Sequence, residues 1–240
     1  MSHHLQPLPW DSDLMGFPVG RLTLDHADAA ETAQALAAAR AAGQHLLYVL
    51  VPPADAPTNC AVLAAGGRLA DRKVTFALSP GPADLAWPPD PAIVPATAHT
   101  LALEALAWQS GAYSRFRLDP RLPATVFQRL YSQWLRNSLD GSIAQVVLTL
   151  KGTAGEAVGL LTLGDKDGVA DIGLLAVAAE FRGQRAGQRL VAEARRRAAA
   201  QGYACLQVVT QGANEQACRF YEKCGFELVD EVNIYHLWLD

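Results

Sequence analysis

The sequence predicts an α/β protein with helices and strands in both halves of its 240 residues. In the first half, the Ala-rich residues 27–42 have high helix propensity and precede an apolar run at 45–51 that is typical of a buried strand. In the second half, three apolar or alternating segments between residues 143 and 177 predict an antiparallel meander. The last of these strands passes through small residues into a helix near residue 185. Half of all residues are hydrophobic, which is enough for a sizeable core.

The remaining elements of the first half suggest a small domain. Residues 10–22 predict a turn that leads into a strand, 59–65 a short helix, and 68–78 a strand. Six of the fourteen prolines fall within residues 79–95, which is therefore the best candidate for a linker. We expect an N-terminal α/β domain over residues 1–90 and a second domain over residues 91–240.

The second domain is expected to alternate helices and strands after an initial pair of helices. A loop is expected at residues 112–123 and a turn at 164–168. Helices are expected at residues 98–111, 124–137 and 184–201, and strands at 143–150, 157–163, 169–177 and 204–210.

The charge and the cysteines exclude several classes of function. The formal net charge is −4, so a basic nucleic-acid footprint is not expected. The basic run at 195–197 is expected on a solvated helix face, with Glu193 paired to Arg197. The four cysteines lack zinc-ligand spacing, so we expect no metal site and interpret them as reduced thiols of a cytoplasmic protein. Neither a membrane span nor a secretory signal is expected.

A phosphate-binding loop is predicted where the strand at 171–177 leads into the next helix. The connecting residues, R-G-Q-R-A-G at 182–187, are mostly small. The first amides of a helix have no partners within it and lie at the positive end of its dipole, so they bind phosphate readily. Arg182 and Arg185 would add charge-assisted hydrogen bonds. An ordinary strand–turn–helix is the alternative interpretation.

A second motif, N-E-Q-A-C-R-F-Y-E-K-C-G-F, follows at residues 214–226. Asn214 is a good N-cap and Gly225 a good C′ residue. Tyr221 lies two turns after Asn214, so both face the same way. The order strand, phosphate loop, helix, strand, Asn-capped helix and Gly-Phe resembles the acyl-CoA half of the GNAT N-acetyltransferases. Arg185 departs from that family's R-G-x-G-x-G motif, because it stands at the middle Gly position.

Three further segments resemble a narrower group. They are L-P-W-D-S-D-L-M-G-F-P-V-G-R-L near the N-terminus, the loop and helix at residues 114–141, and I-G-L-L-A-V with V-V-T-Q-G-A-N downstream. Together they are similar to the bacterial dTDP-fucosamine acetyltransferase group, which acetylates the amine of a nucleotide-linked amino-deoxysugar for surface polysaccharide synthesis. The resemblance implies the GNAT fold: a mixed, mostly antiparallel sheet flanked by helices, with a smaller N-terminal α/β domain and the sugar nucleotide near the junction.

The resemblance also implies acetyl-CoA as co-substrate and a set of residues that bind it. The backbone of the strand at 175–177 would lie beside the pantetheine, with a splayed or bulged strand freeing its amides and carbonyls. The expected cofactor-binding residues are Leu175, Ala176, Val177, Arg182, Gly183, Gln184, Arg185, Ala186, Gly187, Gln188, Asn214 and Phe220.

Two residues are candidates for proton transfer. The resemblance puts the proton donor for the leaving thiolate at Tyr221, and a phenol is protonated at neutral pH. Packing of the last helix is the alternative role for this tyrosine. Asp71 is the candidate general base, because the narrower group carries an acidic residue at this position. Asp11, Asp13 and Asp171 are alternatives.

The expected acceptor is a small amine-bearing substrate, in the first instance a nucleotide sugar. Arg115 and Arg117 could clamp its diphosphate, since Arg forks suit phosphate oxygens. The aromatic candidates for stacking on thymine or sugar, which would otherwise pack the core, are Trp10, Phe116, Tyr131 and Trp134.

Other interpretations stay open at this point. With the same fold, the acceptor could be a protein N-terminus, a polyamine or a small metabolite amine. A non-catalytic acyl-CoA-binding module is supported only by Arg185 in the loop. An exposed final strand would allow pairing across a two-fold axis in a homodimer.

Overall fold

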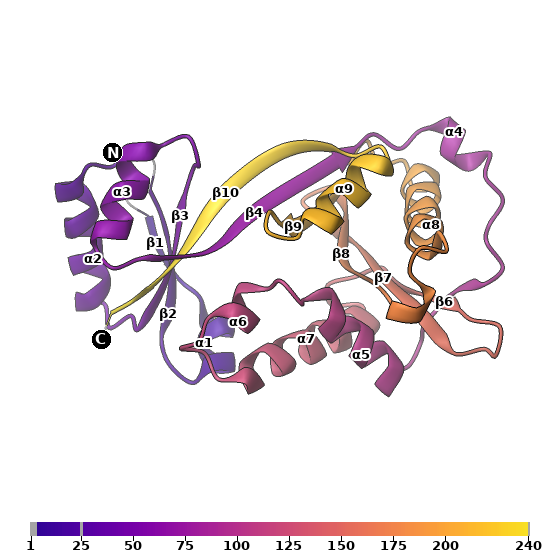
Figure 1. Cartoon of the computed structure of the whole chain (residues 1–240), viewed down its shortest axis with the longest axis horizontal. Coiled ribbons are helices and arrows are strands. Elements are labelled where there is room, and N and C mark those ends of the chain that lie inside the picture. The colour runs from indigo at the N-terminus through magenta and orange to yellow at the C-terminus, as the bar shows by residue number, and fades with distance from the viewer. Residues whose placement is uncertain (1–3, 25, 240) are drawn as a thin grey trace.

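The described residues form a single sheet of ten strands with helices on both sides (Figure 1). The computed structural model describes residues 4–24 and 26–239. The strands are β1 (His4–Pro7), β2 (Val19–Thr23), β3 (Leu46–Val51), β4 (Arg68–Leu78), β5 (Ile93–Pro95), β6 (Val146–Lys151), β7 (Ala157–Lys166), β8 (Val169–Val177), β9 (Leu206–Gln211) and β10 (Glu227–Trp238). The helices are α1 (Pro9–Met15), α2 (Ala29–Ala41), α3 (Ala56–Ala64), α4 (Pro82–Leu85), α5 (Leu101–Ser110), α6 (Arg115–Leu118), α7 (Ala124–Leu139), α8 (Ala186–Ala200) and α9 (Glu215–Lys223), with a 3-10 turn η1 at Ala179–Phe181.

The strand order is β1-β2-β3-β10-β4-β9-β8-β7-β6-β5. The pairs β2–β3 and β8–β9 are parallel, and the other neighbouring pairs are antiparallel. The expected mixed, mostly antiparallel sheet and the meander of β6, β7 and β8 are thus confirmed. In Figure 1 the long strands β4 and β10 run side by side from the N-terminal strands to the strands that hold β8 and β9.

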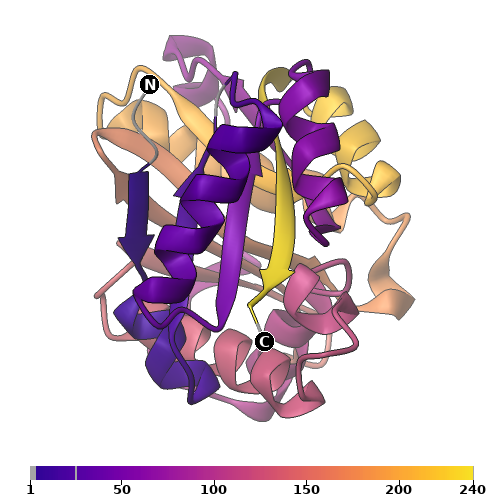
Figure 2. The ribbon, with the colours of Figure 1, turned by 90° about the vertical axis from the view of Figure 1, so that its left-hand side faces the viewer.

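Apolar clusters on both faces of the sheet hold the helices in place. Helix α8 packs on one face through Leu190 and Ala194, together with Tyr221 of α9. Helices α5 and α7 pack on the opposite face through Leu106 and Leu130. At the N-terminal end, α2 and α3 cover the strands, and they lie in front of them in Figure 2. The sheet is therefore sandwiched between helices over most of its width.

The segment before β2 differs from the prediction. The sequence predicts only a turn, but the structure forms helix α1 there. Pro9 occupies the first turn, where its missing N–H costs nothing. Gly16 ends the helix in the left-handed conformation at φ +82°. The hydroxyl of Ser12 accepts from the N–H of Val19 at 2.9 Å, which ties the helix to the strand that follows.

The proline-rich segment at 79–95 is anchored along its length. It contains helix α4 and strand β5, and β5 pairs with β6. Asp84 forms an ion pair with Arg195 of α8 at 2.8 Å, and Asp90 accepts two hydrogen bonds from Arg189 at 2.6 and 2.9 Å. The domain boundary near residue 91 stays a prediction, and the sheet is continuous across it because β4 lies between β10 and β9.

The basic run on α8 is not simply a solvated face. The predicted pair of Glu193 with Arg197 is present at 2.7 Å. Glu193 is buried, however, and it also accepts two hydrogen bonds from Arg196 at 2.8 Å each. Arg195 turns to the Asp84 carboxylate instead. Glu193 belongs to α8 and pairs with Arg196 and Arg197 at i,i+3 and i,i+4, so the fold brings only the Asp84 carboxylate to the helix.

The final strand is internal, contrary to the expected exposed strand. Strand β10 pairs with β3 through residues 233–238 and with β4 through residues 227–236. Within the described chain, β1 and β5 are the edge strands. A two-fold pairing through the last strand is therefore blocked by its own neighbours, and a homodimer stays a prediction without this route.

Asp84→Ala is expected to lower the free energy of unfolding by about 2 kcal/mol, because the partly buried Arg195 and the N–H of Gly81 both lose their acceptor. Urea unfolding measures the change. The control is Asp230→Ala, on an exposed part of β10, which should stay within about 0.5 kcal/mol of the unaltered protein. Equal losses in the two variants would contradict an anchoring role for Asp84.

Candidate active site

The site begins where two parallel strands separate. Strands β8 and β9 are in register only as far as the pair Ile172 and Val208, although both strands continue beyond it. Next to this point β8 carries a bulge against β7, where Leu161 faces Leu175 and Leu163 faces Ile172. The expected splaying and bulge are both present. The separated strand ends leave a cleft that continues between α8 and α9.

The bulge also turns the side chains of β8. Before it, Ile172 packs into the cluster under α8 and α9; after it, Leu174 packs into the cluster under α5 and α7. Residues two apart on a regular strand share a face. The extra residue of the bulge is therefore the reason that Ile172 and Leu174 point to opposite faces of the sheet. The N–H of Leu174 donates to the hydroxyl of Thr162 at 2.8 Å, which replaces a partner lost at the bulge.

The predicted phosphate loop follows β8 and has two residues in the left-handed region. Gly183 has φ +75° and Arg185 has φ +61°. Helix α8 therefore begins at Ala186, two residues later than predicted, because Arg185 serves as its N-cap with non-helical angles. A Cβ on Gly187 would lie 3.1 Å from the ring of Phe220, so a small residue lets α8 and α9 approach closely at the cleft.

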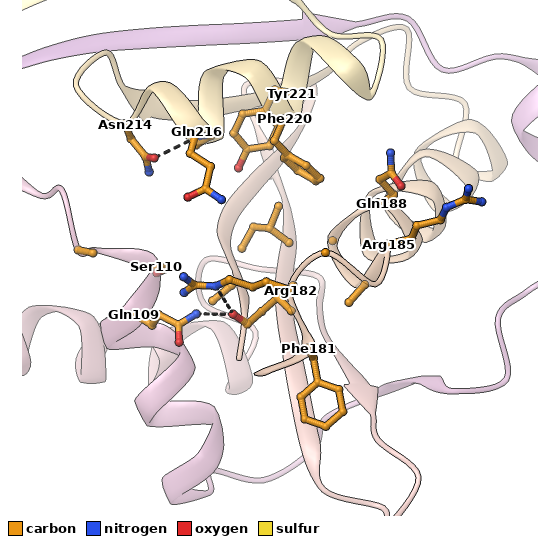
Figure 3. A pocket seen from close by; sticks show the side chains of 18 of the residues that line it. Gln109, Ser110, Phe181, Arg182, Arg185, Gln188, Asn214, Gln216, Phe220 and Tyr221 are labelled. Atoms are coloured by element: carbon orange, nitrogen blue, oxygen red, sulfur yellow. Dashed lines mark hydrogen bonds between the residues drawn. The ribbon is translucent and has the colours of Figure 1, made fainter. Parts of the chain in front are cut away.

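The first cavity, of about 460 Å³, lies between this loop, the end of β8 and helix α9 (Figure 3). Every residue predicted to bind the cofactor lines it except Gln184, whose side chain donates to the carbonyl of Glu180 at 3.0 Å. Figure 3 shows the side chains of Arg182 and Arg185 pointing in opposite directions, the latter along α8. The lining residues that sequence reasoning missed are Gln109, Ser110, Ala112, Tyr113, Phe181, Gln216 and Ala217.

Arg182 is fixed at the mouth of the first cavity by a shared acceptor. Its Nε donates to the carbonyl of Val177 at 3.1 Å. Gln109, at the end of α5, donates to the same carbonyl at 2.5 Å (Figure 3). The contact through Nε leaves the terminal nitrogens of the guanidinium available for another acceptor. This cation, the loop amides and the start of α8 together suit a diphosphate.

Tyr221 is held by an aromatic cluster at the inner end of the first cavity. Its ring centroid lies 5.2 Å from that of Phe220, 5.7 Å from Phe226 and 6.0 Å from Phe76. Burial raises the pKa of the Tyr221 phenol above its ordinary value, so the hydroxyl keeps its proton at neutral pH. Asn214 caps α9 as predicted, accepting from the N–H of Ala217 at 3.2 Å, and lies on the same cleft-facing side as Tyr221.

A second cavity, of about 310 Å³, lies on the other side of Tyr221. It is lined by Asp71 of β4, by Asp171 of β8 and by residues of α6 and α7. Five residues line both cavities, and Tyr221 is among them; the others are Ser110, Leu175, Asn214 and Ala217. The two spaces therefore meet at the phenol.

Half-buried carboxylates characterise the second cavity. Burial raises the pKa of Asp71 to about 6, although the positive charges of Arg115 and Lys73 act in the opposite direction. Burial also raises the pKa of Asp171, against a hydrogen bond from Gln207 and the charges of Lys166 and Lys73. Of the carboxylates considered as a base, only Asp71 and Asp171 line this cavity. Asp11 accepts instead from the hydroxyl of Tyr48 at 3.1 Å.

The expected acceptor-binding residues divide into two groups. Arg115, Phe116 and Tyr131 line the second cavity, as does Trp134. Arg117 does not line it, and its guanidinium lies 5.5 Å from the ring of Phe127. Trp10 and Asp13 lie outside both cavities. The loop expected at 112–123 forms helix α6, whose N-cap Ser114 accepts from the N–H of Phe116, and this short helix is what points Arg115 inward.

Two lysines that line the second cavity were not predicted from the sequence. Lys73 lies two residues after Asp71 on β4, and alternation along a strand places the two on one face. The position of Lys73 beside Asp71 could therefore have been predicted from the sequence. Lys166 stands at the end of β7, where a turn was expected, because β7 continues to that residue. Gln109 and Ser110 could not be found, since only the packing of α5 beside β8 brings them to the cleft.

The left-handed angle at Arg185 makes a testable prediction about stability. Arg185→Gly is expected to be more stable than Arg185→Ala by about 1 kcal/mol, because only glycine adopts φ +61° without steric cost. At Arg182, where φ is −70°, the same two changes should rank in the opposite order. Urea unfolding of the four variants gives the comparison, and the same order at both positions would contradict the explanation.

Comparison with known proteins agrees with this geometry. The acetyltransferase (GNAT) family matches residues 102–226. The dTDP-fucosamine acetyltransferase of Escherichia coli O6:H1 (strain CFT073) is 32% identical over 160 residues, which are 64% of this chain and 68% of that protein. The spore coat polysaccharide biosynthesis protein SpsD of Bacillus subtilis (strain 168) is 30% identical over 151 residues. That match covers 63% of this chain, which spans half the length of SpsD.

Solved structures share the fold at low sequence identity. A conserved protein of unknown function from Staphylococcus epidermidis has a TM-score of 0.71 at 11% identity, with 96% of this chain and 89% of that chain covered. A GCN5-related N-acetyltransferase from Sphaerobacter thermophilus has a TM-score of 0.61 at 14% identity, with 98% and 76% covered. No helix among the described residues is long and apolar enough to cross a membrane. With its family match over more than half of its length, its splayed strands and its loop at the start of α8, the chain belongs to the GNAT family of acetyltransferases.

Proposed function

We propose that this GNAT acetyltransferase transfers acetyl from acetyl-CoA to the amine of a nucleotide-linked amino-deoxysugar in the cytoplasm. Acetyl-CoA would occupy the first cavity, with its pyrophosphate at the loop of residues 182–187. The sugar nucleotide would occupy the second cavity. Both would be bound at once, and the amine would attack the thioester directly.

The observation that carries this proposal is the meeting of the two cavities at Tyr221. A donor and an acceptor placed on either side of it would have their reacting groups side by side. Holding two reactants in this way removes much of the entropic barrier to a bimolecular step. A binding module for acyl-CoA alone has no need of the second cavity or of its half-buried carboxylates.

The proposed chemistry assigns one proton transfer to each cavity. The acceptor ammonium loses a proton to Asp71, directly or through water. The amine nitrogen then forms a bond to the thioester carbonyl carbon, and the bond from carbon to sulfur breaks. The Tyr221 hydroxyl donates its proton to the departing thiolate, and the second proton of the newly acylated nitrogen returns through water to the Tyr221 oxygen. The raised pKa of Tyr221 keeps the donor protonated, and a pKa of about 6 makes Asp71 a base near neutral pH.

The sugar acceptor is supported by the relatives and by the charges of the second cavity. One relative carries the name dTDP-fucosamine acetyltransferase and the other is a polysaccharide biosynthesis protein. Arg115 and Lys73 would suit the diphosphate of a sugar nucleotide, and Asp71 and Asp171 its ammonium and hydroxyl groups. Other acceptors with the same fold, such as a peptide N-terminus, a polyamine or a small metabolite amine, form the second candidate class.

The acceptor class is tested by CoA release with a panel of amines. The panel contains dTDP- and UDP-linked amino-deoxysugars, a polyamine and an N-terminal peptide, each with acetyl-CoA. We expect turnover with a nucleotide sugar at least about tenfold above that with the other amines. Turnover with the polyamine or the peptide alone would replace the sugar proposal. Binding of acetyl-CoA without turnover of any amine would favour the binding module.

Tyr221→Phe is expected to reduce kcat by about 100-fold while the Kd for acetyl-CoA changes less than about twofold, since the ring packing is kept and only the proton donor is lost. Calorimetry and CoA release measure the two quantities. Phe220→Leu is the matched control, because it changes the wall of the first cavity without removing a proton donor. It should weaken acetyl-CoA binding more than it slows turnover, and an unchanged kcat in Tyr221→Phe would remove the phenol from the mechanism.

The pH dependence of kcat/KM for the acceptor tests Asp71. A base must be deprotonated to act, so activity should fall as the pH drops through about 6. Asp71→Asn should lower the rate by about 100-fold and abolish that limb of the profile. Asp13→Asn, outside both cavities, should leave the limb in place. The same limb in Asp71→Asn would assign the base to another group, with Asp171→Asn the next variant to examine.

A further inference from the structure

Arg115 lies against two aromatic rings, which contact each other edge to face, at the wall of the second cavity. Its guanidinium carbon lies 4.3 Å from the ring centroid of Tyr48 and 4.3 Å from that of Phe116. Phe116 is its neighbour on α6, but Tyr48 belongs to β3 of the N-terminal unit. A cation over an aromatic face is attracted by the negative face of the ring, and the attraction is larger where water is excluded. Strand β3 therefore reaches the acceptor side of the site through Tyr48, in addition to Asp71 and Lys73 of β4, which line the second cavity directly.

Tyr48 is itself fixed by two neighbours. Its hydroxyl donates to Asp11 of α1 at 3.1 Å. Its ring stacks on that of His236, the neighbouring residue across β10, with centroids 5.1 Å apart. His236 in turn contacts the Asp119 carboxylate at 2.5 Å, and this holds its ring in place. A buried tyrosine with these partners has little rotational freedom, so it offers Arg115 a fixed surface.

Arg115 has unused hydrogen-bonding capacity. Its Nε is buried and has no hydrogen-bond partner among the described residues. The guanidinium faces a cavity that also carries Lys73 and the carboxylate of Asp71. An arginine whose charge rests against aromatic rings keeps N–H donors for an anion, and the planar fork suits phosphate oxygens. These two ring contacts thus orient the guanidinium and leave its N–H donors for a ligand.

We propose that Tyr48, with Asp11 behind it, is a positioning residue that holds Arg115 ready for an anionic phosphate group of the acceptor. This inference rests on the proposed function, in which the acceptor carries a diphosphate. It gives the N-terminal residues 1–90 a further part in substrate recognition, because Tyr48 of β3 and Asp11 of α1 hold the arginine that binds the phosphate. Neither Tyr48 nor Asp11 lines the second cavity, so the proposed effect passes through Arg115, while the Tyr48 ring also contacts that of Phe116.

The test distinguishes an effect of Tyr48 on the position of Arg115 from an effect of Tyr48 on the stability of the fold. Tyr48→Leu is expected to raise the KM for the nucleotide sugar about tenfold while the KM for acetyl-CoA stays within about twofold. Tyr48→Phe keeps the ring and should stay within about threefold of the unaltered enzyme. The control is Tyr235→Leu, which removes a ring from the opposite face of the same strands, where Tyr235 contacts Asn59. It should lower Tm without changing the KM for the acceptor.

A double-mutant cycle with Arg115→Ala distinguishes a positioning role of Tyr48 from a purely structural one. A purely structural effect on the acceptor KM would be the same with and without Arg115. In the Arg115→Ala background, Tyr48→Leu should add less than about twofold to the acceptor KM, because its target is already gone. The full effect of Tyr48→Leu in that background would overturn the proposal. An acceptor KM unchanged in Tyr48→Leu, or raised equally in Tyr235→Leu, would overturn it as well.

Failure of the proposed function has a different signature. If the unaltered enzyme acetylates no nucleotide sugar, the sugar proposal fails, and inorganic pyrophosphate then serves as the probe. Its binding to the CoA-saturated enzyme, measured by calorimetry, should weaken about tenfold in both Tyr48→Leu and Arg115→Ala. Equal pyrophosphate binding in all three proteins, or no binding to the unaltered enzyme, would overturn the positioning role of Tyr48.

Discussion

The separation of β8 from β9 after Ile172 and Val208 is the constraint on which the site depends. Two strands that part inside a sheet leave backbone groups and a wedge of space that a ligand can fill. The wedge stays open because different helices pack beside its two strands, α5 next to β8 and α9 next to β9. The bulge in β8 adds the change of face that sends Leu174 toward α5 and α7. Without the separation, the loop before α8 would face packed side chains.

The site also depends on the long strand β10. It closes the sheet between β3 and β4, and so joins the N-terminal strands to the strands that carry the site. His236 of this strand packs on Tyr48, and Ile234 lines the second cavity. The N-terminal unit is therefore part of the same rigid sheet as the cleft. A change in how β3 is held can reach the acceptor side of the site through a short chain of side-chain contacts.

The electrostatics of the second cavity follow from burial. Asp71 and Asp171 sit in a poorly solvated space, which disfavours their charged forms and raises the pKa of each. Arg115, Lys73 and Lys166 offset part of this cost. Such an arrangement is costly for stability and useful for chemistry, because a carboxylate that titrates near neutral pH can accept a proton from an ammonium group and release it again. The cations in turn favour an acceptor that carries negative charge.

The sequence by itself determined the local features of the site. The small residues of the loop at 182–187, the Asn214 cap and the spacing to Tyr221 are properties of neighbouring residues, and the meander of β6 to β8 is readable from alternation. The mixed sheet was implied by the resemblance of these elements, in their order, to the GNAT acetyltransferases. Every residue predicted to bind the cofactor borders the first cavity except Gln184, whose side chain turns back to Glu180, but seven further lining residues were not predicted.

Only the tertiary structure decided which distant segments meet. The internal position of β10, the contact of Gln109 with the carbonyl of Val177, and the stacking of Arg115 on Tyr48 join residues far apart in the chain. No local propensity encodes such contacts, because they follow from how helices and strands pack on a sheet whose strand order differs from chain order. The same reason explains why Arg195 of the basic run on α8 pairs with Asp84, and so why the proline-rich segment is anchored to that helix.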